Sequence, residues 1–443
     1  MTLNSYLLKS AGVAALGGLL FGFDTAVIAG ATAALTKTYS LSPAMLGFTV
    51  SSALWGTILG AMFAGAPGDR LGRRDSLRVM AVFYLLSAVG CAVAWNWYAL
   101  LFFRFIGGLG IGGSSVLGPM YIAEVSPAKW RGRLVGLFQF NVVAGILVAY
   151  LSNYLIGLAS LGAAEWRWKL GVSAIPAALF LAMLFSIPRS PRWLVARHRR
   201  TEEAREVLRL IGEEGVDEEL TSIVRSIDVE HGRGHEPLFT RKYARPVFLA
   251  IAIGFFNQML GVNAILYYLN DIFARAGFSK VSGDLQAVAI GLTNLIAVII
   301  AMLLIDRAGR KQLLLIGSVG CAFCLAGVAW VFATNTHPSL LLWLLVGFIA
   351  FFSFSQGAVI WVYISEVFPN RVRAKGQSLG SFTHWAMNAV VSGLFPVVAS
   401  YSHAAPFAFF AVMAVAQFFV VLSFFPETKG ISLEEMQSRL RIA

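Results

Sequence analysis

Charged residues are scarce in this chain of 443 residues: they make up 13% of it, about half their share in an ordinary soluble domain. Cysteine is scarcer still, because only Cys91, Cys321 and Cys324 occur, all in apolar segments. The spacing of Cys321 and Cys324 can indicate redox or metal chemistry, but no further thiol or histidine is nearby. We therefore expect packing roles for these side chains and no metal site. The composition excludes a soluble enzyme, a disordered chain and a disulfide scaffold.

Apolar residues are abundant instead, at 58% of the sequence with a mean hydropathy of +0.72. A helix needs ~20 apolar residues to cross the hydrocarbon core of a membrane, and the apolar runs predict twelve such spans. The first run contains Asp24 and is too long for a cleaved signal peptide. The predicted spans are 10–34, 45–66, 76–95, 98–123, 133–157, 169–187, 245–273, 285–305, 312–333, 340–364, 376–400 and 405–425.

Lys and Arg predict the orientation, because they concentrate on the cytoplasmic side of membrane proteins. If the N-terminus is cytoplasmic, all but a few of the 35 Lys and Arg residues also lie on the cytoplasmic side. The exceptions are Lys37, Arg167, Lys169, Arg275 and Lys280 on the outer side and Arg104 within a span. We therefore expect both termini and the polar stretch 188–244, read as short amphipathic helices, in the cytoplasm. The location implied is a cell membrane, such as a bacterial inner membrane, crossed many times.

Two motifs occur twice at nearly the same spacing. GDRLGRR at 68–74 recurs as IDRAGRK at 305–311, and YIAEVSP at 121–127 recurs as YISEVFP at 363–369. The repeats predict two pseudo-symmetric six-helix bundles, 1–187 and 245–443, joined by the linker 188–244. The fold class is therefore an all-α membrane protein with the major facilitator fold and a binding site near the midplane between the halves.

The repeated motifs also predict a cytoplasmic gate. Their glycines suit a tight turn, and their Asp residues can pair with Arg or lie at a helix N-terminus. We hypothesise two charge networks that hold the bundles together when the cavity faces outward, although the basic residues could simply set topology. The gate residues are Asp69, Arg73, Glu124, Arg131, Asp306, Arg310, Glu366 and Arg373.

Taken in order, the motifs resemble those of the sugar porters of the major facilitator superfamily over nearly the whole chain. The resemblance rests on the GRR and GRK turns, on PRSPRWL at 188–194 and PETKG at 426–430, and on NQMLGVN at 257–263 followed by two tyrosines. It implies a transporter rather than an enzyme, without a cofactor. A transporter-like sugar sensor is a remote alternative. Such a sensor would need a cytoplasmic output region, whereas only a short tail follows Pro426.

Amide side chains suit a sugar, because its hydroxyls both donate and accept hydrogen bonds. Gln139, Gln258, Asn263 and Asn294 are uncharged amides inside predicted spans, and they also match sugar-contacting positions of the family. Amides that only join helices are the plainer alternative. The resemblance alone adds further substrate-binding positions: Phe21, Asn257, Trp361, His384 and Trp385.

Four positions depart from the family pattern. Asn257 replaces a Gln, and His384 stands where members have Gln or Asn. Both changes reshape the pocket and leave the identity of the sugar open; His384 can be a neutral hydrogen-bonding group or a pH-sensitive ligand. In addition, Gly357-Ala358 replaces Gly-Pro, and Arg189 replaces the Glu of the loop after the sixth span.

Asp24 and Arg104 each lie inside a predicted span, where an isolated charge costs about 3 kcal/mol. Mutual pairing would relieve much of that cost. A permanent ion pair is one reading; in the other, movement of Arg104 away lets Asp24 take up a proton. In the family, proton-coupled members carry this Asp and Arg, whereas the facilitators have Asn in place of the Asp.

The sequence therefore predicts a proton-coupled monosaccharide symporter, for pentose or hexose uptake by alternating access. A passive sugar uniporter is the nearest alternative. The expected partners are a xylose- or glucose-like monosaccharide, a proton and membrane lipid, without nucleic acid, and we expect a monomer.

Overall fold

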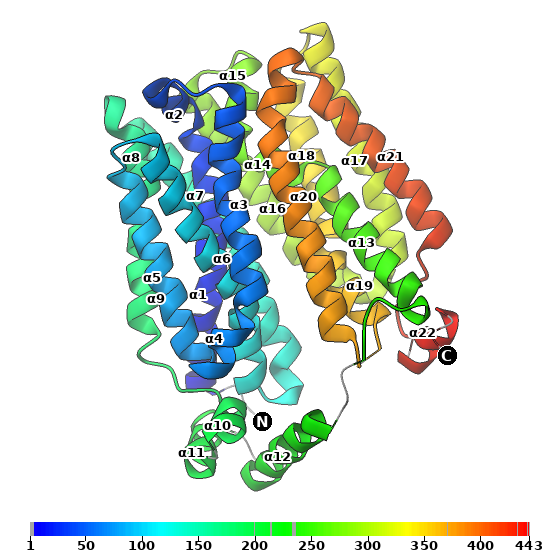
Figure 1. Ribbon diagram of the computed structural model, residues 1–443. Helices are drawn as coiled ribbons and strands as arrows, with labels where there is room; N and C mark the ends of the chain where they lie inside the picture. Colours follow the sequence, from blue (N-terminus) through cyan, green and yellow to red (C-terminus); the bar gives the residue numbers. More distant parts are fainter. Residues whose placement is uncertain are drawn as a thin grey trace. The chain divides into compact units, whose positions relative to one another are not determined.

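The computed structural model describes residues 4–198, 200–212, 215–232, 236–369, 371–431, 433–440 and 442. Within its helices, the side chains of 128, 197, 198, 226, 228–232, 306, 433 and 434 lie outside this description. Over the described residues every regular element is a helix, and none is a strand (Figure 1). The all-α prediction is confirmed for this part of the chain.

The helices divide into two compact units. Unit 1 contains Met1–Thr25, Trp55–Ala149 and Arg167–His235, and unit 2 contains Ala26–Leu54, Tyr150–Trp166 and Glu236–Ala443. Long helices such as α1 contribute residues to both units, so this division does not follow chain order alone. The bundles 1–187 and 245–443 stay a prediction.

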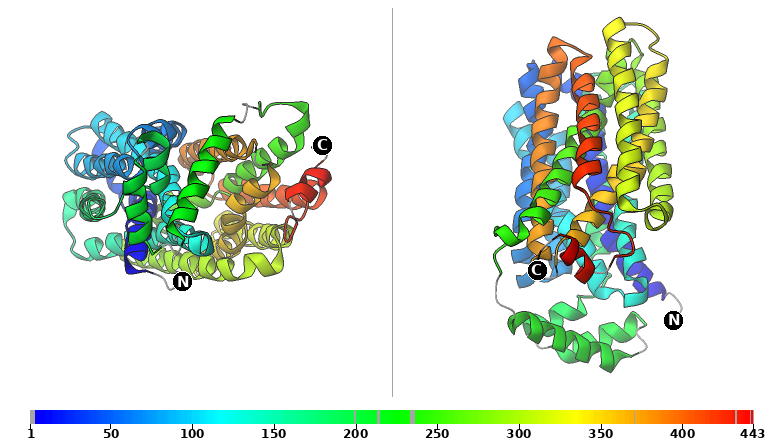
Figure 2. Two further views of the ribbon diagram at one scale, coloured as in Figure 1. Left: turned by 90° about the horizontal axis from the view of Figure 1, so that it is seen from below. Right: turned by 90° about the vertical axis from the view of Figure 1, so that its right-hand side faces the viewer.

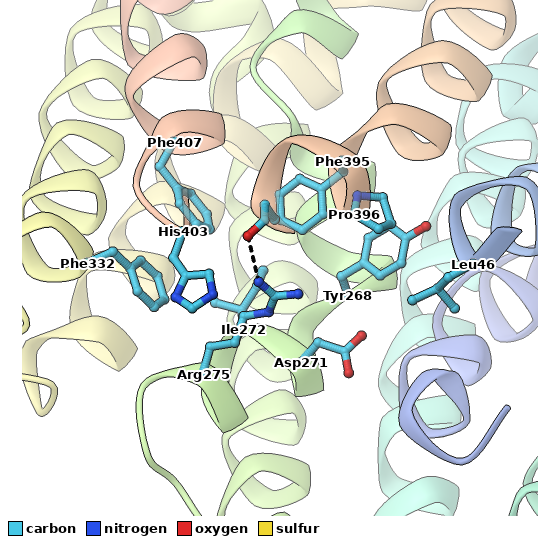
Figure 3. Close-up of a pocket in the computed structure, with 11 residues that line it drawn as sticks. Leu46, Tyr268, Asp271, Ile272, Arg275, Phe332, Phe395, Pro396, His403 and Phe407 are labelled. Atoms are coloured by element: carbon cyan, nitrogen blue, oxygen red, sulfur yellow. Dashed lines mark hydrogen bonds between the residues drawn. The ribbon is translucent and has the colours of Figure 1, made fainter. Parts of the chain in front are cut away.

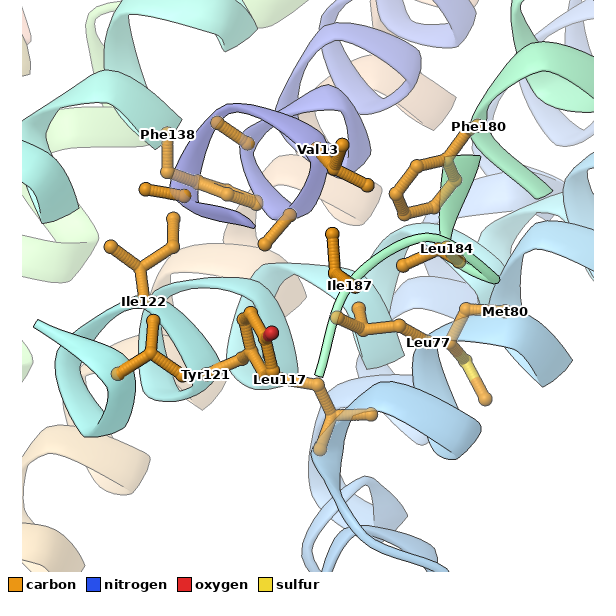
Figure 4. Packing of buried hydrophobic residues seen from close by; sticks show 14 of the residues in the cluster. Val13, Leu77, Met80, Leu117, Tyr121, Ile122, Phe138, Phe180, Leu184 and Ile187 are labelled. Atoms are coloured by element: carbon orange, nitrogen blue, oxygen red, sulfur yellow. The ribbon is translucent and has the colours of Figure 1, made fainter. Parts of the chain in front are cut away.

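Unit 1 is built around long helices with a buried apolar seam. Figure 4 shows Leu77, Leu117 and Phe180 from three different helices meeting in this core, and all three are fully buried. Figure 2 shows α10, α11 and α12 beyond the ends of the long helices of this unit. The helices of unit 1, some of them shared, are α1 (Ser5–Val27), α3 (Pro43–Phe63), α4 (Gly65–Arg70), α5 (Arg73–Ala92), α6 (Trp97–Val125), α7 (Ala128–Leu158), α8 (Glu165–Gly171), α9 (Ala174–Met183), α10 (Pro191–His198), α11 (Thr201–Leu210) and α12 (Val216–Gly232).

Unit 2 has its own core, in which α17 packs against α18 and α21, and α13 packs against α20 (Figures 1 and 2). Two of its membrane-length helical segments are interrupted, one at Gly261 and one by a π-helical turn, η4. Its further elements are η1 (Ile28–Gly30), α2 (Thr32–Tyr39), η2 (Gly162–Ala164), η3 (Arg241–Tyr243), α13 (Ala244–Met259), α14 (Val262–Tyr267), α15 (Leu269–Arg275), α16 (Lys280–Ala308), α17 (Arg310–Thr334), α18 (Leu340–Phe352), η4 (Ser353–Gly357), α19 (Ala358–Val367), α20 (Arg373–Tyr401), α21 (Ala405–Phe424) and α22 (Leu433–Arg439).

Eleven helical segments of the described residues are long and apolar enough to cross a membrane. They correspond to the predicted spans except the sixth, 169–187, which falls on two shorter helices, α8 and α9. Pro176 has no N–H to donate to the carbonyl of Val172, and the Ser173 hydroxyl donates to the Leu170 carbonyl at 2.7 Å. Both features interrupt helical hydrogen bonding at this point.

The repeated GRR and GRK motifs form matching turns. Gly72 before α5 has φ +90°, and Gly309 before α17 has φ +88°. A residue with a side chain rarely adopts this backbone conformation, so glycine is needed at both positions. The prediction of tight turns at these glycines is confirmed.

Candidate functional site

A break in the seventh predicted span brings its amides together. Gly261 has φ +78°, and a Cβ there would lie 2.2 Å from the ring of Phe410, so the break between α13 and α14 depends on glycine. The Gly261 N–H donates to the carbonyl of Gln258 at 2.8 Å, which closes the turn. Gln258 and Asn263 therefore lie on either side of a single turn. Discontinuous helices of this kind form substrate sites in transporters.

Gln258 is the centre of a hydrogen-bonded cluster in unit 2. Asn263 donates from Nδ2 to Gln258 Oε1 at 3.0 Å, and Gln258 donates from Nε2 to Asn257 Oδ1 at 2.9 Å. Both ring nitrogens of His384 lie 3.2 Å from the same Nε2. An amide can form up to four hydrogen bonds, more than these contacts use, so the cluster keeps capacity for a polyhydroxylated ligand.

Two tryptophans flank His384. The ring of Trp361 on α19 lies 5.1 Å from the imidazole, and the ring of Trp385 lies 5.0 Å from it in an edge-to-face geometry. Trp385 is 5% exposed, whereas Trp361 remains 37% exposed. The exposed indole offers an apolar surface next to the amide cluster, which suits the C–H face of a sugar ring.

Asn294 and Asn257 both contact the π-helical turn η4. The Ser353 hydroxyl donates to Asn294 Oδ1 at 2.7 Å, and Asn257 donates from Nδ2 to the Gln356 carbonyl at 3.2 Å. Ser353 and Gln356 were not among the residues predicted from the sequence. Polar residues inside the long apolar span 340–364 were the available signal, because such residues need a reason to be there.

The remaining predicted sugar residues, Phe21 and Gln139, belong to unit 1. Phe21 lies on α1 and packs against the apolar core of that unit, and Gln139 lies on α7. Both are half-buried. The predicted sugar-binding residues are therefore divided between the units. Gln258, the five residues clustered with it and Asn294, which is linked to them through η4, belong to unit 2. Phe21 and Gln139 belong to unit 1.

Asp24 on α1 and Arg104 on α6 both belong to unit 1. Arg104 is 4% exposed, Asp24 is half-buried, and the two opposite charges attract each other electrostatically. Two buried residues of α5 belong to the same unit: Cys91, and Tyr84, whose hydroxyl lies 2.8 Å from Ser114 Oγ. Neither residue was predicted to have a functional role, because a buried Tyr or Cys in a span is ordinarily a packing residue.

A charge network lies at the end of α6 in unit 1. Arg73 donates from Nε to Glu124 at 2.9 Å and from a terminal nitrogen to Asp69 at 3.0 Å. Glu124 also accepts a hydrogen bond from the Ser190 hydroxyl. Arg73 and Glu124 are 13% and 9% exposed, while Asp69 is 72% exposed. The energetic weight therefore lies on the pair of Arg73 and Glu124, because exposed pairs contribute little.

Unit 2 contains a closely similar network. Arg310 holds both oxygens of Glu366, at 2.9 and 3.2 Å, and the Thr428 hydroxyl donates to Glu366 at 2.6 Å. Thr428 occupies the place that Ser190 has in unit 1. The hydroxyl of Tyr121 donates to a proline carbonyl, that of Pro188, just as the hydroxyl of Tyr363 donates to Pro426. The repeated motifs thus form equivalent networks, each contained within one unit.

The other predicted gate residues have different places. Arg131 and Arg373 each donate from Nε to a backbone carbonyl five residues earlier, at 3.4 Å in both cases. They therefore clamp the turns after α6 and α19 rather than pairing with Glu124 and Glu366. The side chain of Asp306 lies outside the described residues.

Glu427 adds a helix cap to the network of unit 2. Its carboxylate accepts the backbone N–H groups of Arg310 and Lys311 at the start of α17, at 2.9 and 3.0 Å, and those of Thr428 and Lys429. Partial burial alone would raise the pKa of Glu427. The hydrogen bonds from Lys429, Arg310, Lys311 and Thr428 outweigh it, so the pKa lies below its usual range.

A separate pocket lies in unit 2 (Figure 3). Aromatic rings of Tyr268, Phe332 and Phe395 line it, together with Asp271 and Arg275. Arg275 donates to the Ala399 carbonyl at 2.8 Å, as the dashed line shows. None of the residues predicted to bind sugar lines this pocket.

Comparison with known proteins identifies the family. The model described as "Sugar (and other) transporter" matches residues 11–440. An arabinose-proton symporter of Bacillus subtilis is 38% identical, over 96% of this chain and 93% of its own. A glucose transport protein of Synechocystis is 36% identical over 97% of both chains, and a D-xylose-proton symporter of Escherichia coli is 35% identical over 98% of this chain and 96% of its own.

Solved structures agree with the sequence comparisons. The xylose transporter from E. coli in an inward open conformation has a TM-score of 0.88 at 33% identity, covering 98% of this chain and 100% of that one. Its partially occluded inward open form has a TM-score of 0.87, with 97% and 100% covered. The chain therefore has the major facilitator fold and belongs to the sugar porter family, as a multi-pass membrane sugar transporter and not an enzyme.

Proposed function

We propose that this protein takes up a monosaccharide, a pentose or a hexose, together with a proton. The observation that carries the coupling is the pair of Asp24 and Arg104, a carboxylate and a guanidinium that interact inside two spans of unit 1. The amide cluster around Gln258, with the exposed face of Trp361 beside it, supports sugar binding. Relatives named as proton symporters of arabinose and xylose point the same way.

The proton step follows from the charge pair. In the resting protein Arg104 stabilises the Asp24 carboxylate, since a buried charge needs a partner. Protonation of Asp24 from outside removes that attraction and frees Arg104. Sugar then binds to the amides of unit 2, the transporter reorients by alternating access, and sugar leaves inward. Asp24 finally releases its proton to the cytoplasm and pairs with Arg104 again.

Proton coupling changes what the transporter can do. One charge moved across ~100 mV is worth ~2.3 kcal/mol. Since ~1.4 kcal/mol is a factor of ten, this supports roughly 50-fold accumulation of sugar. A passive uniporter supports none.

The proposed topology places both termini in the cytoplasm of a bacterial cell. Positive residues support it, because few Lys and Arg fall on the other side. The networks of Arg73 with Glu124 and of Arg310 with Glu366 then lie at the cytoplasmic ends of their helices. Because the described contacts of each network lie within one unit, we assign them the role of holding the helix ends of a cytoplasmic gate in place.

Replacing Asp24 with Asn tests the coupling. The amide side chain of this variant cannot titrate, so exchange of labelled sugar across proteoliposomes should survive while uphill uptake driven by a pH gradient should vanish. Asp284→Asn is the matched control, because Asp284 is another carboxylate inside a helical span, 2% exposed and hydrogen-bonded to Asn270. The control should keep uphill uptake. Uphill uptake by the Asp24 variant would refute the coupling role and leave a uniporter.

Replacing Gln258 with Ala tests the sugar site. Asn257, Asn263 and His384 would each lose their hydrogen-bond partner in Gln258. The affinity for labelled sugar should therefore fall at least tenfold. Gln377→Ala on α20 serves as the control, because Gln377 is an exposed amide. Equal binding by the two variants would contradict the assignment.

A further inference from the structure

A chain of polar side chains crosses the core of unit 2 behind Asn257. Gln417 on α21 donates from Nε2 to Gln356 Oε1 at 2.8 Å, and Gln356 donates from Nε2 to Ser318 Oγ at 3.4 Å. Ser318 in turn donates to the Leu314 carbonyl at 2.7 Å. Gln417 is 1% exposed, and Gln356 and Ser318 are 0% exposed. Three elements, α17, η4 and α21, are joined by this chain.

This series of hydrogen-bonded side chains is connected through η4 to the amides that we propose bind sugar. The carbonyl of Gln356 accepts from Asn257, and Ser353, the first residue of the same turn, donates to Asn294. A π-helical turn is a rare and marginal geometry that occurs mostly at functional sites. Side-chain contacts from neighbouring helices are what can fix its register.

This series of hydrogen-bonded polar side chains contributes little to the stability of the fold. Gln417 Oε1 is buried and has no hydrogen-bond partner among the described residues, so the chain ends on an open acceptor. A partly satisfied buried network is less favourable than an apolar core, and Leu would fit an apolar span without this cost. The amides at 356 and 417 therefore need an explanation other than packing.

We propose that Gln417 and Gln356 are positioning residues that hold η4 in the register that presents Asn257 and Asn294 to the sugar. This second layer of amides, behind those that touch the ligand, sets the preference among monosaccharides. The inference rests on the proposed function, because it assigns a role within the same site.

The test is uptake kinetics of Gln417→Leu with two sugars, the preferred one and a weaker competitor identified with the unaltered protein. The apparent KM for the preferred sugar should rise about five- to tenfold, while the maximal rate stays within about twofold. The KM ratio between the two sugars should move towards one. Ser318→Ala removes only the far end of the chain, and it should shift the ratio in the same direction by a smaller amount.

Gln286→Leu is the matched control, because Gln286 is an amide in another span of unit 2 that bonds to Ser282. It should leave the KM ratio unchanged. An unchanged ratio in both Gln417→Leu and Ser318→Ala would overturn the inference, whether or not the maximal rate falls, since a structural role lowers transport of both sugars alike. If Gln258→Ala abolishes binding while these two variants leave the ratio unchanged, only the inference fails. Full binding by Gln258→Ala would instead overturn the proposed function.

Discussion

The cap that Glu427 places on α17 gives a prediction whose size follows from its contacts. Glu427→Ala leaves the N–H groups of Arg310 and Lys311 without their acceptor, and loss of an N-terminal cap costs about 1–2 kcal/mol. Glu427→Gln keeps one acceptor oxygen but loses the charge, which costs about 0.5–1 kcal/mol near a helix N-terminus. With an unfolding entropy of about 2.1 cal/mol/K per residue, a chain of 443 residues shifts by about 1 °C per kcal/mol, so Tm should fall by about 1–2 °C in the Ala variant and by less in the Gln variant.

The pH dependence of this effect has a definite sign. The pKa of Glu427 is lower in the folded protein than its usual value. Its stabilising contribution is therefore complete above the unfolded pKa of about 4.3, and it is lost as the pH falls through the folded pKa. The Tm gap between the unaltered protein and Glu427→Gln should be constant from pH 8 to pH 5 and should close as the pH drops below about 4.

Fluorescence-monitored unfolding of the purified protein in detergent measures both effects. Arg189→Ala is the control, since Arg189 occupies the corresponding loop of unit 1, where it makes partly exposed ion pairs with Asp75 and Glu203 and lies over the Trp193 ring. Such pairs contribute about 0–1 kcal/mol. A Tm for Glu427→Ala equal to that of the unaltered protein would refute the capping argument. A gap that persists unchanged at pH 3 would refute the role of the charge.

Two further predictions concern the gate and the aromatic wall. Glu366→Gln weakens the two-point contact with Arg310, so labelling of a cytoplasmic reporter cysteine should become faster; an unchanged labelling rate would contradict the gate assignment. Trp361→Ala should raise the apparent KM for sugar about tenfold while Trp361→Phe raises it less, as measured by initial uptake rates. Equal effects of the two substitutions would mean that the aromatic face is not what the sugar contacts.

Hydropathy predicted most of the fold because each span must bury about 20 apolar residues in lipid. The sixth span departs from this rule at Val172 and Ser173, where Pro176 and a serine hydroxyl interrupt the helix. The break at Gly261 was not predicted, because glycine is common inside spans and only its positive φ marks a turn. Local backbone conformation is not visible in an apolar pattern.

The candidate site was predicted where a residue type is costly in a span or belongs to a motif. Asp24 and Arg104 were selected because charges in lipid need partners; both lie in unit 1, and their role in coupling stays a prediction. Gln356 and Gln417 were missed because no motif contains them and their partners come from other helices. The sequence named Arg73, Glu124 and Arg131 as gate residues but could not tell which of them pair, because this depends on how the turn after α6 folds.

The most direct test of proton coupling is the pH of a lightly buffered medium when sugar is added to de-energised cells that make this protein. Because sugar and proton enter together, the medium should become alkaline on addition of a transported sugar. The signal should be absent in cells making Asp24→Asn, although labelled sugar still equilibrates across their membrane. Sugar entry without any alkalinisation by the unaltered protein would contradict the account and identify a passive transporter.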